Sequence, residues 1–596
     1  MQRFLSEKIV FGLRWIFLCI LFLAFYFYFF SLNKFHLFYL EQTQLFRFSG
    51  DYFKPFIEKP GEFIFYVGEF FSQFFINPYL GAGIVTLLAA AICFLTHLIL
   101  KKLGINALIF SLIPVLLIAA LQSNHLYKVG LTVGIIFSLS FGLGYLQLTR
   151  NLIRYIIGGI VWFLLYHLTG GIALLASLLA VLFELFYFNS KTKWITISAI
   201  ILVSVGFPYL AWKFFYLVTF RDAWFYPLPF WGVSRMPLFA ALLAYLPVVI
   251  VILSGYKQIR KRKVVDVPLN YKTILAGSFI VILGMVFVKT KNYDPKIEIF
   301  LGMDHYVQSE DWNKVIALSK TYPGVNQLVL YYTNLALYKT GQFSDRMFDF
   351  PQHGINGLRL QWTRDEVTPF FGGEIFYQLN YINEAYRWAF ESMVAKGLNP
   401  RSLKRLVQTS LINGHYEIAA KYLNVLDQTM FYKDWATSYK RYVSDTTQIG
   451  QNKELAEKRQ FLVKRDFISY DLGLNELLTE HSENRMAYEY QMAAFLLNKD
   501  IKSFAANIYR LKEFRYRAIP VNYEEALLFC MTYLKKDLVP EGYTIRPATI
   551  QRKNEYVAGI SRCGGDRDRA ARELYKQFGN TCWYYLHFAE QTNKYL

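Results

Sequence analysis

"FGLRWIFLCILFLAFYFYFFSL", residues 11–32, is a run long and apolar enough to cross a bilayer. It is too long and too aromatic for the apolar core of a signal peptide, and it lacks a small-residue cleavage site. We therefore interpret it as a retained span. Eight further apolar runs precede residue 291, so the sequence predicts nine spans, at 12–33, 79–100, 106–122, 129–148, 153–169, 171–188, 194–213, 237–255 and 272–290.

The composition changes near residue 290. The chain has 596 residues, of which 54% are hydrophobic and 18% aromatic, and the long apolar blocks all lie in residues 1–290. Residues 291–596 instead carry charges at the helical spacing typical of a soluble domain. The predicted fold class is all-α: a polytopic transmembrane domain, 1–290, followed by a water-soluble helical domain, 291–596.

Basic residues flank the predicted spans and indicate their orientation. With nine spans, all the basic clusters fall on one side: Arg3, Lys8 and Arg14, then Lys101 and Lys102, Arg150 and Arg154, Lys191 and Lys193, and the stretch "YKQIRKRKVVDVPLNYK" at 256–272. By the positive-inside rule that side is the cytoplasm. We expect a bacterial inner-membrane protein with a cytoplasmic N-terminus and a periplasmic C-terminal domain.

The net charge of +20 is explained largely by these clusters between spans, so no nucleic-acid partner is expected. The chain has five cysteines and no pair at metal-ligand spacing. Cys563 and Cys582 are both in the domain predicted to be periplasmic, where they would form a disulfide or remain free thiols in helices.

The soluble half contains repeated helical hairpins. "DHYVQSEDWNKVIALSKTYPGVNQLVLYYTNLALYKTGQ", residues 304–342, reads as helix, turn, helix and a closing glycine, and later segments follow the same plan. These segments resemble degenerate tetratricopeptide repeats, and we expect three to five hairpins stacked as an α-solenoid. Most Tyr, Trp and Ala positions at helical spacing would be packing. The concave face would bind a protein, a peptide or a glycan, or it would simply dock on the membrane half.

No motif of a soluble enzyme is present: there is no phosphate-binding P-loop, nucleophile elbow, zinc-protease motif or dinucleotide fingerprint. The four connections on the other side of the predicted membrane are 33–78, 122–128, 167–171 and 214–237. The first is long and contains "YLEQTQLFRFSGDYF", residues 39–53, where acids alternate with aromatics. After Pro60 and Gly61, "EFIFYVGEFFSQFF" at 62–75 predicts an amphipathic helix along the membrane surface.

A span, an acidic outer loop, a surface helix and a returning span together resemble the first unit of the GT-C class of integral-membrane glycosyltransferases. The resemblance implies a polyprenyl-phosphate-linked sugar donor and an acidic residue of the first outer loop at the catalytic centre, although the adjacent pair of acids common in the class is absent. The layout also resembles a family of uncharacterised Bacteroidota membrane proteins, which implies no activity.

Glycosyl transfer needs a base near the attacking hydroxyl, and positive charge or a metal near the leaving phosphate. Glu41, which is nearest the end of the first span, is the first candidate for the base, and Asp51 is the second. The candidates for binding the donor phosphate are Lys213, Arg221, Arg235, His125 and His167. A divalent metal would suit the phosphate, but the sequence requires none and indicates no other cofactor.

Each of these candidates has a simpler interpretation. An acid in an outer loop is usually just solvated, Arg221 and Asp222 would form a local ion pair, and a histidine at a span end usually packs at the interface. The alternative function is therefore a non-enzymatic membrane anchor that presents a helical-repeat scaffold to periplasmic proteins. A transporter is the weakest reading, because the predicted spans hold few ionisable groups.

Overall fold

A computed structural model describes residues 16–188, 190–230, 236–261, 264–266, 271–363, 365–463 and 472–589. Within them the chain is almost entirely helical, and one parallel pair of short strands, β1 (Ile105–Asn106) and β2 (Val265–Asp266), joins two connections. The all-α prediction is confirmed. The chain divides into two compact units, unit 1 with Met1–Asp294 and Gln428–Phe431, and unit 2 with Pro295–Asp427 and Tyr432–Leu596.

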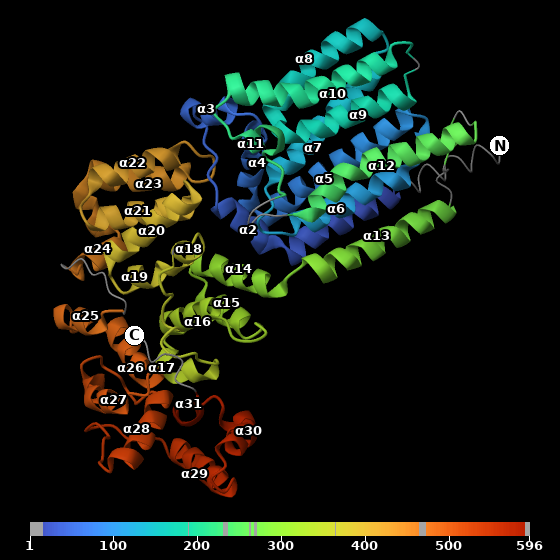
Figure 1. The fold of residues 1–596 in the computed structure, drawn as a ribbon. Helices are drawn as coiled ribbons and strands as arrows, with labels where there is room; N and C mark the ends of the chain where they lie inside the picture. Colours follow the sequence, from blue (N-terminus) through green and yellow to red (C-terminus); the bar gives the residue numbers. More distant parts are fainter. Residues whose placement is uncertain are drawn as a thin grey trace. The chain divides into compact units, whose positions relative to one another are not determined.

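Unit 1 is built from long apolar helices around a shared core (Figure 1). Its α-helices are α2 (Lys34–Gln42), α3 (Gly50–Glu58), α4 (Phe63–Ser72), α5 (Pro78–Lys102), α6 (Leu112–Gln122), α7 (Val129–Gln147), α8 (Asn151–Thr169), α9 (Ala173–Phe186), α10 (Lys193–Leu210), α11 (Phe220–Phe225), α12 (Pro237–Ile259) and α13 (Tyr271–Asn292).

Among the described residues, six helical stretches are long and apolar enough to cross a membrane: Pro78–Lys102, Val129–Gln147, Asn151–Phe186, Lys193–Phe215, Pro237–Ile259 and Lys272–Asn292. A seventh is added if Ile16–Leu32 and Lys34–Gln42, which meet at a bend of 69°, count as one span. Length and composition therefore give fewer spans than the nine predicted. The bend also places a helix, α2, where the sequence predicted the start of a loop.

The 36-residue stretch Asn151–Phe186 reverses direction near its middle. Gly170 has a φ of +57°, a left-handed conformation that favours glycine, and it ends α8. Beyond it α9 returns alongside α8, so that Arg154 Nε lies 2.8 Å from Glu184 Oε1, with both side chains fully buried. The stretch is therefore two helices that pack against each other.

At one end of unit 1, connections rich in lysine and arginine contact one another. The β1–β2 pair joins the connection after α5 to the connection after α12. Asn151 Nδ2 donates to Ser190 Oγ at 3.3 Å, which joins the start of α8 to the segment before α10. We call this the basic end, because Lys101, Lys102, Arg150, Lys191 and Lys193 belong to it.

At the other end of unit 1, the connections 33–78, 122–128, 167–171 and 214–237 meet. Gly61 N donates to His167 O at 3.0 Å, and Gly171 N donates to Tyr226 O at 2.7 Å. Tyr28 and Ser123 exchange a side-chain hydrogen bond at 2.9 Å. We call this end the loop face. The four connections that the charge pattern assigns to one side therefore form one surface.

Unit 2 consists of short helices in sequence, and consecutive members of α14–α16 and of α20–α23 pack on each other. Its α-helices are α14 (Pro295–Gln308), α15 (Trp312–Ser319), α16 (Gln327–Lys339), α17 (Phe343–Arg346), α18 (Thr368–Gly372), α19 (Glu374–Gln378), α20 (Ile382–Lys396), α21 (Pro400–Ile412), α22 (Tyr416–Asp427), α23 (Lys433–Ser444), α24 (Lys453–Gln460), α25 (Leu474–Glu480), α26 (Arg485–Leu497), α27 (Ile501–Asn507), α28 (Val521–Leu534), α29 (Pro547–Arg562), α30 (Arg567–Phe578) and α31 (Cys582–Phe588). The solenoid of tetratricopeptide-like hairpins stays a prediction.

Cys563 and Cys582 are buried free thiols, so they do not form the disulfide considered above.

Candidate functional site

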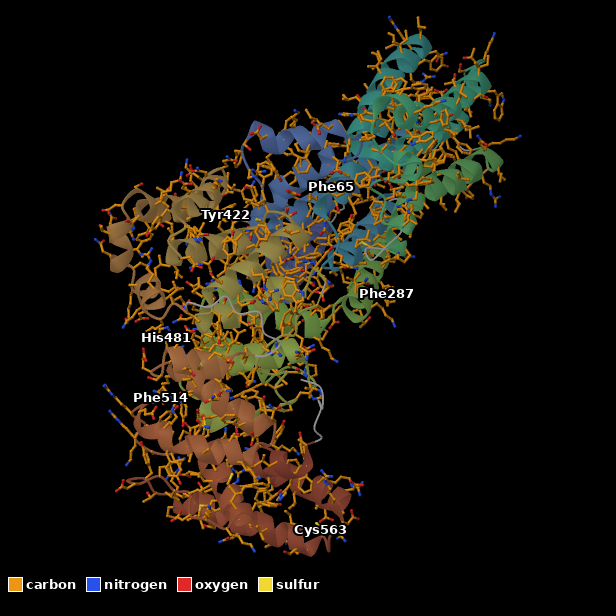
Figure 2. The ribbon with its side chains drawn as sticks, turned by 60° about the vertical axis from the view of Figure 1, so that its left-hand side comes forward. Phe65, Phe287, Tyr422, His481, Phe514 and Cys563 are labelled. Atoms are coloured by element: carbon orange, nitrogen blue, oxygen red, sulfur yellow. The ribbon has the colours of Figure 1, made fainter. Side chains whose placement is uncertain are left out.

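The loop face contains a cavity of about 250 Å³. Three of the four loop-face connections line it: Phe65 comes from α4 in 33–78, Lys128 from 122–128, and Arg221, Asp222 and Tyr226 from α11 and the residue after it in 214–237. Phe65, which is labelled in Figure 2, forms part of its wall. Two cations, one carboxylate and three aromatic rings thus border one space.

Glycines hold the walls of this cavity together. A Cβ on Gly170 would lie 2.3 Å from Tyr226 O, and a Cβ on Gly171 would lie 2.4 Å from Trp224 O. Gly61 Cα approaches the same point, since a Cβ on Gly170 would lie 3.1 Å from it. The turn "HLTGG" therefore does more than reverse the chain: its glycines admit the backbone of the 214–237 connection to contact distance.

The helix α4 rests on α7 through a second glycine contact. A Cβ on Gly68 would lie 2.4 Å from Gly130 N, and one on Gly130 would lie 2.7 Å from Ile64 O. Both neighbours are backbone atoms, so no rotamer change can relieve such a contact. The contact fixes α4 against the start of α7, where Lys128 precedes the first turn.

Two carboxylates of α4 are each bound by a tyrosine from another segment. Tyr226 OH donates to Glu62 Oε1 at 2.8 Å, and Tyr52 OH donates to Glu69 Oε2. The acids are seven residues apart, which places them on one side of α4 and about 10 Å apart along its axis. Phe65 lies between them in the sequence. The Lys128 ammonium lies over the Phe65 ring, 5.1 Å from its centroid.

The environment of Glu69 strengthens the affinity of its carboxylate for a proton. Burial is the main cause and raises the pKa of Glu69 above its usual value, while the hydrogen bond from Tyr52 and the nearby Lys128 act in the opposite direction. A carboxyl group with a raised pKa next to a cation-lined cavity is typical of a group that takes up or releases a proton during catalysis.

A single family extends over both units of this chain. The model of a family described as a family of unknown function, DUF6057, matches residues 8–589. The chain belongs to the DUF6057 family. No curated protein and no solved structure matches it.

Of the five phosphate-binding candidates predicted for this DUF6057 protein, only Arg221 borders the cavity among those in the described residues. Its Nε lies 3.7 Å from Asp222 Oδ1, as expected of a local ion pair, and 62% of its side chain is exposed. Lys213 is exposed on a π-helical turn, Ala211–Phe215, with its ammonium near the Tyr209 and Phe214 rings. Arg235 lies outside the described residues.

The two histidine candidates lie in the loop face but do not line the cavity. The His167 ring makes a 2.9 Å hydrogen bond with Tyr216 OH through Nδ1, and the two rings are stacked. The His125 ring centroid lies 6.3 Å from that of Tyr39. Both histidines are half-buried among aromatic neighbours, as the packing interpretation expects.

The two predicted candidates for the base are far apart in environment. Glu41 is 3% exposed near the end of α2, where Gln42 Nε2 donates to its Oε2 at 2.6 Å. Asp51 is exposed in the first turn of α3. Neither lines the cavity, whereas Glu62 and Glu69 of the same connection lie beside residues that do. Glu62 and Glu69 are farther along the chain from the first span than Glu41 and Asp51, and no local pattern in the sequence distinguishes them from the other acids of the connection.

Sequence reasoning also missed Lys128. The available signal was its position, because a lysine ends the short "QSNHLYK" connection on the side expected to be poor in basic residues. Within the described residues, no group of three or more His, Cys, Asp or Glu side chains is placed to hold a metal ion.

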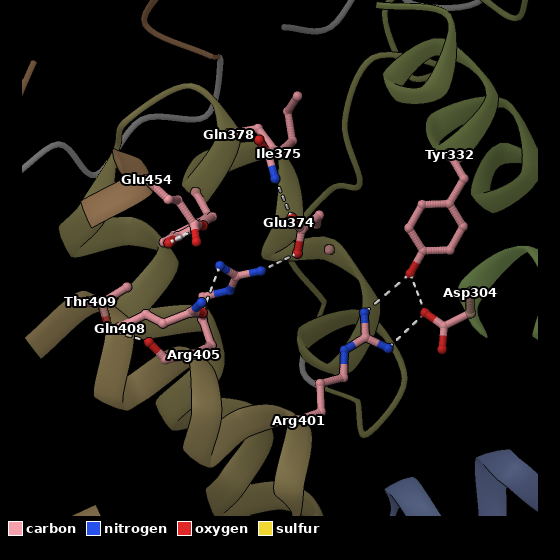
Figure 3. Close-up of polar contacts among 12 residues, drawn as sticks. Asp304, Tyr332, Glu374, Ile375, Gln378, Arg401, Arg405, Gln408, Thr409 and Glu454 are labelled. Atoms are coloured by element: carbon pink, nitrogen blue, oxygen red, sulfur yellow. Dashed lines mark hydrogen bonds and ion pairs between the residues drawn. The ribbon is translucent and has the colours of Figure 1, made fainter. Parts of the chain in front are cut away.

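Unit 2 contains a second cluster of charges, centred on Arg401 and Arg405 of α21 (Figure 3). Arg401 Nη1 donates to Asp304 Oδ1 at 2.7 Å, and Arg405 Nη2 donates to Glu374 Oε2 at 2.6 Å. Arg405 also lies 3.5 Å from the Tyr377 ring centroid. Each guanidinium already has a carboxylate partner, so the cluster ties helices together and is not offered as an anion site.

The buried Lys458 belongs to the same region of this DUF6057 protein. Burial, with Lys339 and Arg405 nearby, lowers the pKa of Lys458 to about 7. Its ammonium donates to Tyr377 O at 2.6 Å and to Asn380 Oδ1 at 3.0 Å. These bonds join α24 to α19 and to the segment after it, so we interpret Lys458 as a structural contact.

Replacing Arg405 with methionine is expected to lower the free energy of unfolding by about 3–5 kcal/mol, because the buried Glu374 carboxylate would lose its counter-charge. Burial would raise the pKa of Glu374, yet Arg405 lowers it below its usual value. Arg569→Met removes an exposed i,i+4 pair with Glu573 and should cost much less, because water already solvates both charges of that pair. Thermal unfolding of the full chain in detergent compares the variants, and equal losses would contradict the structural role of Arg405.

Proposed function

We propose that this DUF6057 protein is an integral-membrane, GT-C-like glycosyltransferase that uses a polyprenyl-phosphate-linked sugar at the outer face of a bacterial inner membrane. The observation that carries the proposal is the loop-face cavity, where Lys128 and Arg221 border one space beside the carboxylates of α4. Cations serve a phosphate leaving group, and a nearby carboxylate serves the attacking hydroxyl.

In the proposed reaction, an acceptor hydroxyl attacks the anomeric carbon of the donor while the bond from that carbon to the phosphate oxygen breaks. The proton of the hydroxyl passes to a carboxylate, for which we propose Glu69, in place of Glu41 or Asp51. Lys128 and Arg221 hold the oxygens of the departing polyprenyl phosphate. Phe65 and Tyr226, which also line the cavity, offer apolar faces for the sugar ring or the first isoprene.

The proposed topology has nine crossings. It counts α8 and α9 separately, since they run side by side, and it adds the bent first helix and the shorter apolar helix Leu108–Gln122 to the longer ones. An odd number of crossings puts the N-terminus and unit 2 on opposite sides of the membrane. The positive-inside rule then places the N-terminus and the basic end in the cytoplasm, and the loop face and unit 2 in the periplasm. We further propose that the successive packed helices α20–α23 of unit 2 form a tetratricopeptide-like surface for the acceptor glycan or a periplasmic protein.

Binding of polyprenyl phosphate tests the proposal without knowledge of the sugar, because this product is common to all such donors. The full chain in phosphatidylcholine nanodiscs should bind polyprenyl phosphate at least tenfold more tightly than the uncharged polyprenol. Equal affinity for the two lipids would contradict a phosphate site in the cavity. A panel of radiolabelled polyprenyl-phosphate sugars, followed by release of the sugar, then identifies the donor.

A further inference from the structure

A second cavity in unit 1, of about 350 Å³, lies between α8 and α10 and begins near the basic end. Tyr155 and Thr192 line the part near the basic end, which we call the outer part. Trp162 and Ser204 line the part farther from that end, which we call the inner part. From Thr192 to Ser204 the wall rises by twelve helical residues, about 18 Å. Both helices belong to stretches that are long and apolar enough to cross a membrane, so the cavity would face membrane lipid.

The inner part of this cavity offers a lipid chain an apolar surface. Trp162 Nε1 donates to Ser177 Oγ at 2.7 Å, and Ser204 Oγ donates to the same oxygen at 2.7 Å. These three polar groups therefore satisfy one another. Gly159 leaves the wall open, because a Cβ there would meet nothing within 4 Å.

The outer part of the cavity contains hydroxyl groups from Tyr155 and Thr192. Thr192 Oγ1 lies 3.3 Å from Tyr155 OH and 2.9 Å from Ser190 Oγ, at exposed positions. Arg154 also lines the cavity, but its guanidinium is held by Glu184. Trp194, which is 65% exposed, follows directly, as is typical of the level of lipid headgroups.

Positive charge dominates this region. Arg150 and Lys191 are exposed, and Lys193 is half-buried with its ammonium 5.6 Å from the Trp194 ring centroid. Glu184 is the only acidic residue between positions 70 and 221, and it is bound to Arg154. Lys191 and Lys193, which flank the lining residue Thr192, therefore have no acidic residue nearby in the sequence to balance them.

We propose that this cavity is a binding site for an anionic phospholipid, with one acyl chain between α8 and α10. Its phosphate group lies at the mouth, beside Lys191, Lys193 and the hydroxyls of Tyr155 and Thr192. A basic pocket between transmembrane helices is the arrangement that binds anionic headgroups. The acyl chain of the bound lipid fills the cavity, which would otherwise be empty. The inference does not rest on the proposed transferase activity, because this site lies at the opposite end of the helices from the loop face.

Native mass spectrometry of the full chain in detergent, titrated with phosphatidylglycerol or phosphatidylcholine of equal chain length, tests the site. We expect the wild-type protein to retain phosphatidylglycerol at least tenfold more tightly. Gly159→Leu and, separately, Ala199→Leu place a side chain in the cavity and should each lower retention about tenfold or more, whereas Gly206→Leu on α10, where a Cβ would also meet nothing within 4 Å, should leave it unchanged.

A second pair of variants tests the charges. Lys191→Gln with Lys193→Gln should lower the affinity for phosphatidylglycerol about tenfold to thirtyfold and leave that for phosphatidylcholine unchanged. Lys101→Gln with Lys102→Gln, at the basic end after α5, is the matched control. Unchanged retention in either folded cavity-filling variant, or tighter retention of polyprenyl phosphate than of phosphatidylglycerol at this site, would overturn the proposal.

Discussion

Replacing Lys128 and Arg221 together with glutamine should weaken the binding of polyprenyl phosphate by at least a hundredfold. Each side chain is expected to make a charge-assisted hydrogen bond with a phosphate oxygen, and such bonds contribute about 1.5–3 kcal/mol each. Sugar transfer should fall by at least the same factor, since the cations stabilise charge that develops on the leaving group. Titration of nanodisc-embedded protein with polyprenyl phosphate measures the effect.

The matched control is Lys213→Gln with Lys54→Gln. Lys54 is exposed in the connection 33–78, Lys213 is exposed directly before the connection 214–237, and neither lines the cavity. The control therefore removes the same net charge from the same end of unit 1, and it should change affinity less than threefold. If both double variants weaken binding equally, the attraction is a general effect of surface charge and the cavity is not the phosphate site.

Gly68→Ala should lower the free energy of unfolding by about 3 kcal/mol, the upper end of the usual cost of overpacking. The new methyl group would lie 2.4 Å from Gly130 N, so α4 would have to move away from α7. That movement would displace Phe65 and Lys128 and so disrupt the cavity as well. The temperature of thermal unfolding and the affinity for polyprenyl phosphate should therefore both fall.

Gly83→Ala on α5 is the control for this effect. A Cβ at Gly83 would meet nothing within 4 Å, and alanine is a better helix former than glycine, so this variant should be neutral or slightly stabilising. The two substitutions have the same chemistry and should have opposite signs. A Gly68→Ala protein as stable as Gly83→Ala would contradict the close contact between α4 and α7.

Much of the helical layout could be predicted from the sequence, because hydrophobic runs directly mark long apolar helices. The predicted span 129–148 coincides with α7, Val129–Gln147, and the predicted span 272–290 lies within α13, Tyr271–Asn292. The bend of 69° after residue 32 was missed, since hydropathy continues through it. Glu41 was consequently assigned to a loop, whereas it is buried on α2.

The candidate site was harder to predict than the helices. Arg221 was identified because it lies in an aromatic loop, but other residues that line the cavity come from two other segments of the chain, α4 and the stretch 126–131. Gly61, Gly170 and Gly130 bring those segments together, and a glycine's tertiary contact leaves no periodic pattern in the sequence. Nothing local therefore indicated that Lys128 would border the same space as Arg221.

Labelling of single cysteines with a membrane-impermeant maleimide, in cells whose inner membrane is intact, tests the central claim that the loop face and unit 2 share the periplasmic side. In a cysteine-free background, Asp51→Cys and Asp568→Cys report on the loop face and unit 2, and Lys191→Cys reports on the basic end, all at exposed positions. The account predicts labelling of the first two in cells with a permeabilised outer membrane, and of the third only after lysis. Labelling of Lys191→Cys before lysis, with Asp51→Cys protected, would contradict it.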